Sequence, residues 1–338
     1  MLRKIQHPGF SVPGEIPALR ALLLDLPAPV VFDTADYATF LEAIGLVGMG
    51  GGMFPAGRKI RVSQGVHTLV INGVECEPGI TIDQAILLQH SRWVIAGAEA
   101  SARAVGAKRI ILAVKKKPEL IKQLRKLYSF DLLTMPRSYP AGAEKLILRK
   151  LLGRMPPPGT LPFHLGFLVQ NVASLRAAGR AILDGIPAVE RPLTLVAPDA
   201  DVYQNLIVPV GMTFNELLQA AGCPYDPDSR ILVAGGLMMG REVSADERVT
   251  LGTTSLLVLN RRRLEKEETN CIRCGACYDA CPLKLHPIAL VDMIRNGRPH
   301  TAAFKSQLKE CFLCGACATV CPARIPLAAH LREGKKCL

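Results

Sequence analysis

Eight of the eleven cysteines form one spacing pattern that occurs twice near the C-terminal end of the chain. Each copy reads C-x2-C-x2-C-x3-C-P, and the copies start at Cys271 and Cys311. This run is typical of [4Fe-4S] clusters, in which three cysteines of a copy bind one cluster and the fourth binds the other. The spacing therefore predicts two clusters, with the ligand sets Cys271, Cys274, Cys277, Cys321 and Cys311, Cys314, Cys317, Cys281.

Two other uses of clustered cysteines fit this pattern less well. Structural zinc sites space their ligands as two separated pairs, whereas four cysteines fall within eleven positions in each copy here. Disulfides are disfavoured because residues 1–10 lack the apolar core of a secretory signal, which indicates a cytoplasmic protein. The spacing favours two cubane clusters over zinc, so we expect the protein to transfer single electrons.

The composition of the 338 residues indicates a folded chain of two or three domains. Hydrophobic residues make up 49% of the chain, yet no apolar run reaches the roughly 18 residues that cross a membrane. The net charge of +12 becomes less positive when eight thiols ionise around clusters, and it fits an acidic redox partner or an anionic membrane surface. No aromatic residues interleave with the basic clusters, so nucleic acid is not expected as a partner.

A glycine-rich stretch followed by a lysine has the residue types of a phosphate-binding loop. Gly48, Gly50 and Gly51 stand close together, and Lys59 follows them. Closely spaced glycines let the backbone turn consecutive N–H groups toward a phosphate, and a lysine adds positive charge. By itself the pattern fits an ordinary turn equally well.

The next segment places polar side chains after an apolar run. Residues 68–71 read as a strand, and the following loop carries acceptors for ribityl or ribose hydroxyl groups, namely Asn72, Glu75, Glu77 and Asp83. A polar surface loop is the alternative interpretation, because acidic residues are common there. Together with the glycines, the segment predicts a flavin or nucleotide site.

These two segments resemble the flavin- and NADH-binding core of the C subunit of the Rnf electron-transport complex. That core is shared with the NADH-oxidising flavoprotein subunit of respiratory complex I and with the cobalamin reductase of propanediol utilisation. Further matches follow in the family's order: residues 139–145 with Glu144 resemble its acidic nucleotide-site segment, residues 159–162 resemble the next stretch, and residues 169–172 with Asn171 resemble the stretch that lies against the flavin. Family members carry glycine where Met53 stands, and their N-terminal barrel-sandwich domain is essentially absent here.

The resemblance implies an α/β fold in three modules, a layered architecture that the alternation of helix-like and strand-like segments also favours. Residues 235–240 resemble the signature turn of the second module. The expected parts are an N-terminal extension (1–36), a flavin- and nucleotide-binding α/β layer domain (37–190), a small β-grasp (SLBB-like) module (191–260) and a helical two-cluster ferredoxin-like domain (261–338).

The resemblance also implies the cofactors and the reaction. We expect an electron-transfer subunit that oxidises NAD(P)H via FMN and passes single electrons through two [4Fe-4S] clusters to a partner. The partner would be another redox subunit or a ferredoxin- or flavodoxin-like carrier, and membrane-bound subunits of a larger complex would hold the protein at the inner face of the membrane. In this reading the phosphate is held by Gly48, Gly50, Gly51 and Lys59, the flavin and nicotinamide ribose are positioned by Asn72, Glu75, Glu77, Asp83 and Asn171, and the nucleotide side is lined by Glu144.

Two alternative functions stay open at this point. A side chain at Met53 could obstruct the ligand, and a positive φ there would cost about 1–2 kcal/mol, so the chain could be an electron-relay or docking subunit that has lost nucleotide binding. A cobalamin reductase would share the leading chemistry and differ only in its electron acceptor.

Overall fold

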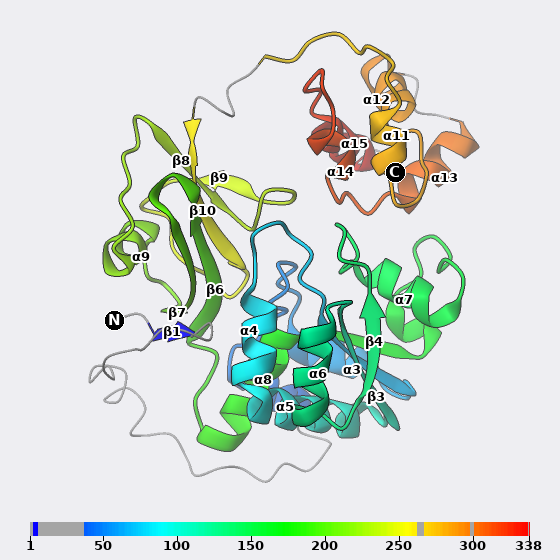
Figure 1. The fold of residues 1–338 in the computed structure, drawn as a ribbon. Coiled ribbons are helices and arrows are strands. Elements are labelled where there is room, and N and C mark those ends of the chain that lie inside the picture. Colours follow the sequence, from blue (N-terminus) through cyan, green and yellow to red (C-terminus); the bar gives the residue numbers. More distant parts are fainter. Residues whose placement is uncertain (1–2, 6–36, 262–266, 298–300, 337) are drawn as a thin grey trace.

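The computed structural model describes the backbone of residues 3–5, 37–261, 267–297, 301–336 and 338. The predicted N-terminal extension lies outside the described residues, except for a short strand, β1 (Arg3–Ile5). Figure 1 shows two bodies that each contain a sheet, and a third body made of helices. This arrangement is the mixed α/β architecture that the sequence predicts.

A parallel sheet forms the centre of the first body. Its strands are β2 (Thr68–Gly73), β3 (Arg109–Lys115), β4 (Asp131–Met135) and β5 (Phe167–Asn171). They lie in the order β4-β3-β2-β5 and pair in parallel throughout. The chain adds β3 and β4 on one side of β2 and then places β5 on the other side, so the strand order reverses between β2 and β5. In open parallel sheets, ligands bind beyond the carboxyl ends of the strands at such a point.

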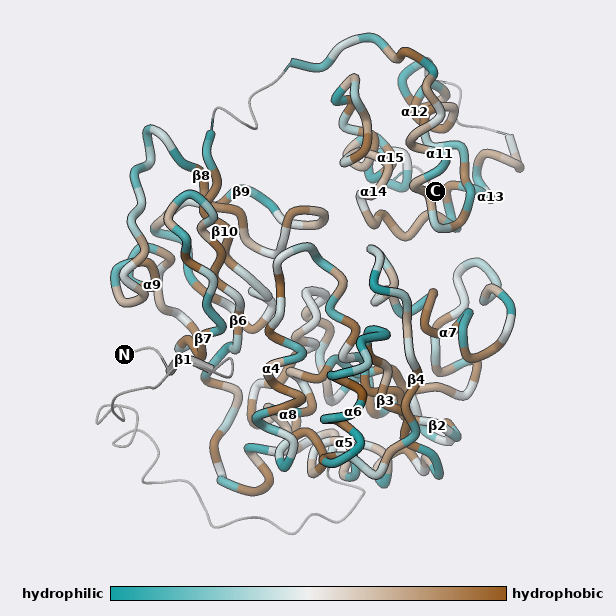
Figure 2. The backbone as a smooth tube through the Cα atoms, in the orientation of Figure 1, coloured by the Kyte–Doolittle hydropathy of each residue, from teal (hydrophilic) through white to brown (hydrophobic). Residues whose placement is uncertain are grey.

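Helices cover both faces of this sheet, because successive side chains of a strand point to opposite faces. Leu69 and Ile71 of β2 are fully buried in one hydrophobic core, whereas Val70 is buried in a second core on the opposite face. In Figure 2 the tube is brown, which marks hydrophobic residues, beside the labels of β3 and β4. The first face carries α4 (Ile82–Gln89), α5 (Ser91–Val105), α6 (Pro118–Leu127) and α8 (Val172–Asp184), extended by α2 (Tyr37–Ala43) and α3 (Ala56–Val62), and the second face carries α7 (Glu144–Leu152) with the short turn η2 (Pro162–Leu165).

The second body is a mixed sheet in the order β1-β7-β6-β10-β8-β9, in which β6 and β10 pair in parallel and the other neighbours pair antiparallel. Its helix α9 (Phe214–Ala221) is capped at both ends: Thr213 and Glu216 form a capping box, and Gly222 ends the helix with φ +65. Phe214 lies in the core of this sheet. The remaining elements are β6 (Glu190–Ala197), η3 (Pro198–Ala200), β7 (Val202–Pro209), β8 (Arg230–Ala234), β9 (Arg241–Val243) and β10 (Ser255–Asn260).

The third body holds the two cysteine runs on short helices around a small core that includes Leu290, Phe304 and Leu331. The two runs have nearly the same backbone: φ is +54 at Arg273 and +57 at Leu313, the equivalent positions of the two copies. Among the described residues, no helix has both the length and the apolar character needed to cross a membrane. The helices are α11 (Ala276–Ala280), α12 (Pro287–Arg295), α13 (Ala302–Glu310), α14 (Ala316–Thr319) and α15 (Leu327–Lys336).

Candidate functional site

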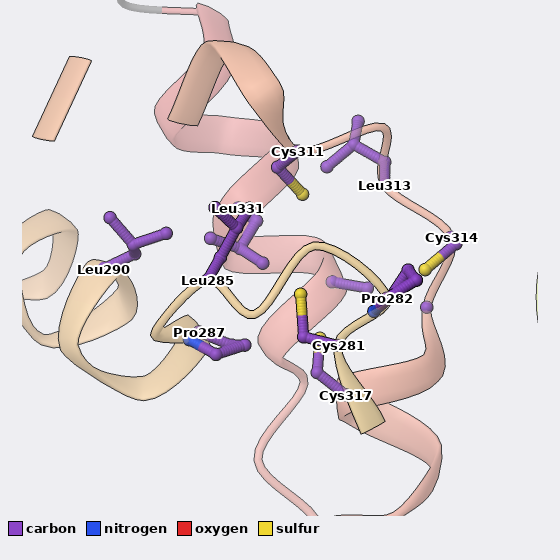
Figure 3. A pocket seen from close by; sticks show the side chains of 12 residues that line it. Cys281, Pro282, Leu285, Pro287, Leu290, Cys311, Leu313, Cys314, Cys317 and Leu331 are labelled. Atoms are coloured by element: carbon purple, nitrogen blue, oxygen red, sulfur yellow. The ribbon is translucent and has the colours of Figure 1, made fainter. Parts of the chain in front are cut away.

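One predicted cysteine set lines a single cavity in the third body. The cavity also has apolar walls, among them Leu285, Leu290 and Leu331, and Figure 3 shows sulfur atoms directed into this space. One of the cysteines comes from the first copy and three come from the second, as the crossed ligand assignment requires. We call Cys281, Cys311, Cys314 and Cys317 the inner set.

The other predicted set, Cys271, Cys274, Cys277 and Cys321, is called the outer set. Cys271 and Cys274 are exposed to solvent, and the backbone N–H of Arg273 donates to the Cys271 Sγ over 3.4 Å. Burial raises the pKa of Cys277, and the charge of Cys321 from the other copy adds to that rise. The crossed pairing therefore also brings these two side chains near each other.

Burial makes the inner thiols hard to ionise in the protein alone. Burial raises the pKa of Cys317 to about 12, and the charges of Cys311 and Cys314 add to the effect. Four thiolates in one apolar cavity are stable only with cations, which the irons of a [4Fe-4S] cluster supply, so the donor set fits that cluster. A single metal ion needs its ligands close together, and in the described parts of the chain no group of three or more His, Cys, Asp or Glu side chains is arranged in that way. In a cubane, by contrast, each thiolate binds a different iron.

Two side chains of the first body hold the inner cysteine loop. The Tyr139 hydroxyl donates to the carbonyl oxygen of Cys314, and Lys145 Nζ donates to the carbonyl oxygen of Glu310 over 3.3 Å. Gly315, next in the loop, has φ +77 and packs so closely that a Cβ there would lie 2.5 Å from the Met238 carbonyl oxygen. Its equivalent in the outer loop, Gly275, has φ +78 and open space around it.

The predicted flavin site lies at the carboxyl edge of the parallel sheet, where the strand order reverses. Asn72 is the penultimate residue of β2, Asn171 is the last residue of β5, and the two are partners in the strand register. The glycine-rich turn lies beside them, since a Cβ on Gly50 would lie 3.4 Å from the Asn171 Cβ. The Met49 N–H donates to Ser174 Oγ of α8 over 2.8 Å, which fixes the turn above this edge.

The glycine-rich turn offers free hydrogen-bond donors to a ligand. Within the described part of the chain, the exposed backbone N–H groups of Gly50, Gly51 and Gly52 donate to no protein atom, and a Cβ on Gly51 or Gly52 would meet open space. Consecutive free amides fit the phosphate of a flavin nucleotide. The Gly48 N–H is not among these free donors, because it donates to the Phe54 carbonyl oxygen over 2.8 Å and closes the turn.

Two predicted ligand residues form an ion pair at the same edge. Lys59 of α3 and Glu144 at the start of α7 are 85 positions apart, and their Nζ and Oε1 atoms are 3.0 Å apart. Both side chains stay partly exposed. The pair can therefore rearrange around an arriving nucleotide without leaving a buried charge.

Asp83 and Glu75 form a buried acidic pair beneath this edge. Asn171 Nδ2 donates to Asp83 Oδ2 over 3.2 Å. Burial raises the pKa of Asp83 to about 8, and the charge of Glu75 raises it further, while Arg191 opposes the rise. Burial likewise raises the pKa of Glu75, whereas the bond that it accepts from the Glu77 backbone N–H lowers it.

Arg191 is a residue of this site that sequence reasoning missed. It is fully buried in β6 and donates from Nε to the Thr253 carbonyl oxygen over 2.7 Å. Burial lowers its pKa to about 10, and the charges of Asp83 and Glu75 act in the opposite direction. The available signal was a charged pair, Glu190 and Arg191, at the head of an apolar strand, because charges buried in a strand need partners.

The remaining predicted polar residues bind protein atoms. Asn72 Nδ2 donates to the Gly142 carbonyl oxygen over 2.9 Å, which joins the β2 loop to the segment before α7. The Glu77 carboxylate accepts from the backbone N–H groups of Met238 and Met239, each over 3.0 Å. Burial raises the pKa of Glu77 to about 7, whereas the bond from Met238 lowers it.

Met53 adopts the positive φ that glycine would favour, at +47. Its side chain lies against the second body, where a Cβ on Gly252 would be 2.6 Å from the Met53 Sδ. Almost half of the side chain, 45%, remains exposed. The methionine therefore accepts backbone strain and turns toward the second sheet.

Comparisons with known proteins agree with this division of the chain. The family described as "Nuo51 FMN-binding domain" matches residues 41–180, and the "4Fe-4S dicluster domain" matches residues 270–325. Both matches confirm the predicted cofactors, FMN and two [4Fe-4S] clusters, at the level of domains.

Curated relatives match most of this chain. The C subunit of the proton-translocating ferredoxin:NAD(+) oxidoreductase complex of Clostridium ljungdahlii is 31% identical over 258 residues, covering 74% of this chain and 56% of its own length. The C subunit of the ion-translocating oxidoreductase complex of Rhodobacter capsulatus is 33% identical, covering 79% and 53%, and that of Actinobacillus succinogenes is 36% identical, covering 89% and 45%. The chain thus spans about half the length of these relatives. The resemblance predicted from the sequence is confirmed.

A solved structure shows a similar fold. A chain of an NAD+-reducing [NiFe]-hydrogenase in the air-oxidized state has a TM-score of 0.57 and 20% identity, covering 94% of this chain and 57% of that chain. At this identity the likeness concerns the fold alone.

Proposed function

Since the chain is homologous to the C subunits of ion-translocating oxidoreductase complexes and carries an FMN-binding domain and a dicluster domain, we propose that it oxidises NAD(P)H and passes single electrons to a partner. Bound FMN supplies the conversion between hydride transfer, which moves two electrons together, and the one-electron chemistry of the clusters. The observation that carries the proposal is the contact of the inner cysteine loop with the domain that matches the FMN-binding family, through Tyr139 and Lys145.

The residues at the sheet edge would bind and orient the flavin. The free N–H groups of Gly50, Gly51 and Gly52 would hold its phosphate, and Asn171 lies within reach of the same turn. Lys59 and Glu144 would open their ion pair toward the nucleotide. These roles are our assignment and follow from the free donors and the partial exposure described above.

The two cysteine sets would act in a fixed order. The inner set lies in an apolar cavity beside the first body, and the outer set has exposed cysteines. We assign the inner cluster to receive electrons from the flavin side and the outer cluster to deliver them. The acceptor would be another redox subunit or a ferredoxin- or flavodoxin-like carrier, and attachment to membrane-bound subunits would follow from the names of the relatives.

Anaerobic purification with iron, sulfide and flavin quantified, followed by addition of NADH or NADPH, tests this function. About eight irons and one flavin, with the visible absorbance bleached by one nucleotide, are expected. The same iron content without flavin or bleaching would contradict the oxidation of NAD(P)H.

A variant pair tests the flavin site itself. Gly51 has φ +98, so Gly51→Ala would distort the turn and should release the flavin while the iron content stays constant. Gly106→Ala is the control, because Gly106 has φ +76 and equally open surroundings at the end of α5, away from the turn. Stoichiometric flavin in Gly51→Ala would show that the turn does not hold the phosphate.

Met53 favours a second candidate function, an electron relay without nucleotide binding. Met53 is a non-glycine residue with φ +47 beside the amides that would hold the flavin phosphate. If purified protein lacks flavin and Met53→Gly binds FMN, the relay function is supported. Reduction of a corrinoid would use the same electron path with another acceptor.

A further inference from the structure

The turn between β8 and β9, residues 235–240, is anchored by one carboxylate from the first body. Glu77 Oε2 accepts from the Met238 N–H and Glu77 Oε1 accepts from the Met239 N–H, each over 3.0 Å. The Glu77 side chain is buried, with 9% of the residue exposed. Both oxygens of a buried carboxylate are thus engaged by consecutive amides of a turn 161 and 162 positions away.

The turn is shaped to enclose this carboxylate. Gly236 has φ +104, and a Cβ there would lie 2.6 Å from the Glu77 Cδ. Gly240 closes the turn, since a Cβ on it would be 2.1 Å from the Gly236 carbonyl oxygen. Only glycine fits at these two positions, so the close approach of Glu77 is part of the turn's construction.

The opposite side of the same turn presses on the inner cysteine loop. The Met238 carbonyl oxygen occupies the place of a Cβ on Gly315, at 2.5 Å, and the Thr319 hydroxyl lies 3.5 Å from the Met238 Sδ. A cavity of about 260 Å³ beside this contact is lined by both parts, including Met239 and Leu313. The turn therefore touches Glu77 on one side and the loop that carries Cys314 and Cys317 on the other.

The first body also contacts the inner cysteine loop directly. Tyr139 donates to the Cys314 carbonyl oxygen, and Tyr139 is tied to the Glu77 loop because the Gly142 N–H donates to Cys76 Sγ over 3.3 Å. Glu77 and Tyr139 thus extend from neighbouring, mutually bonded loops. Between them they hold the inner cysteine loop both directly and through the turn.

We propose that Glu77 is a positioning residue, which clamps the inner cysteine loop onto the flavin-binding body through the turn at residues 235–240. The role differs from the flavin contact predicted from the sequence, and it would keep the inner cluster at a fixed distance from the flavin. The contacts of the clamp involve protein atoms alone. Only its purpose, which is electron transfer from flavin to cluster, rests on the proposed function.

Amide hydrogen exchange of the purified holoprotein tests the clamp without relying on activity. In Glu77→Ala the turn amides and residues 311–319 should exchange at least about ten-fold faster, as expected for the loss of a hydrogen bond to a charged group. Glu77→Gln should give a smaller increase, since one amide oxygen can still accept. Glu242→Ala is the matched control: this exposed glutamate lies on β9 beside the turn, and exchange there should stay at the wild-type rate.

Cofactor content and transient kinetics separate the clamp from a flavin contact. The clamp predicts full flavin and iron in Glu77→Gln, with cluster reduction slowed relative to flavin reduction. Loss of flavin with unchanged exchange in residues 311–319 would overturn the proposal in favour of a direct flavin role. Unchanged exchange together with unchanged flavin would also overturn it. If NADH does not reduce even the wild-type protein, the proposed function fails and the exchange result still decides on the clamp.

Discussion

The two cysteine loops share a backbone and differ in their surroundings. Gly275 and Gly315 have φ +78 and +77, and Lys284 and Arg324, three positions after each fourth cysteine, have φ +52 and +54. The outer loop nevertheless exposes Cys271 and Cys274, whereas the inner loop is covered by the turn at residues 235–240 and by Tyr139. The local sequence sets the geometry of each ligand loop, and distant segments set its environment.

That difference bears directly on redox behaviour. The reduction potential of an iron–sulfur cluster depends on burial, nearby charge and hydrogen bonds to its ligands. Burial raises the pKa of Cys311 and of Cys314 above the usual thiol value. Negative charge is therefore less stable at the inner site than at a site exposed to water. Two chemically equal ligand sets can therefore carry electrons at different potentials within one domain.

Replacing the fourth cysteine of each copy by serine, one at a time, tests the comparison between the two loops most strongly. Because the fourth cysteines are crossed, Cys281→Ser should remove the inner cluster and Cys321→Ser the outer one, each lowering the iron content from about eight to about four. Iron analysis and electron paramagnetic resonance measure the losses. NADH should still reduce the remaining cluster rapidly in Cys321→Ser and only slowly in Cys281→Ser. Equal reduction rates in both variants would remove the proposed order.

Because the two cysteine sets differ in solvent exposure, the two clusters should also lose iron at different rates. In anaerobic protein treated with an iron chelator, the outer half of the iron should leave first, because Cys271 and Cys274 are open to solvent. Iron release followed by absorbance should have two phases, and the paramagnetic signal that survives the first phase should match that of Cys321→Ser. A single phase would mean that the surroundings of the two loops are equivalent in solution.

Acid–base behaviour at the edge of the parallel sheet offers a smaller test. Burial raises the pKa of Asp83 from 3.8 to about 8, so the folded protein holds a proton there that the unfolded chain has released. Stability from this group is therefore lost as the pH rises from about 4 to about 8. Asp83→Asn should flatten the dependence of the melting temperature on pH, by the equivalent of about 1 kcal/mol or more. Exposed Asp228→Asn is the control, and an equal flattening there would assign the effect to net charge.

The smallest expected effect compares one tyrosine from each neighbourhood. Tyr139→Phe removes the bond to Cys314 and should cost about 0.5–1.5 kcal/mol. Tyr278 of the outer run stacks on His286 with its ring centroid 4.7 Å away, and Tyr278→Phe keeps that stacking. Urea unfolding and hydrogen exchange of residues 311–319 should respond to the first change only. A response of equal size to Tyr278→Phe would show that the inner loop is not held specifically.

Local patterns in the sequence predicted the elements well. The C-x2-C repeats predicted two ligand loops, and the backbones of the two loops match. The strand predicted at residues 68–71 is β2, which extends to Gly73 and so includes the polar Asn72. These signals lie within a few residues of one another and are set by backbone geometry.

Contacts between distant segments were beyond such reasoning. Glu77 has the same residue type and loop position that a flavin contact would need, and only the fold brings the Met238 amide to it. Arg191 likewise looks like a strand-end charge until β6 packs over Asp83. The direction in which the Met53 side chain turns depends on Gly252, almost two hundred positions away. Each of these depends on how two bodies pack, which periodicity and spacing do not encode.

The two loop glycines carry unequal evolutionary constraint. At Gly275 only the left-handed backbone must be kept, and asparagine or aspartate tolerates that conformation at modest cost. Gly315 must keep both the conformation and the missing side chain, since the Met238 carbonyl oxygen fills that space. A substitution at Gly315 should therefore cost more stability than the same substitution at Gly275. A lineage could adapt the outer loop to a new electron acceptor while the inner loop stays fixed.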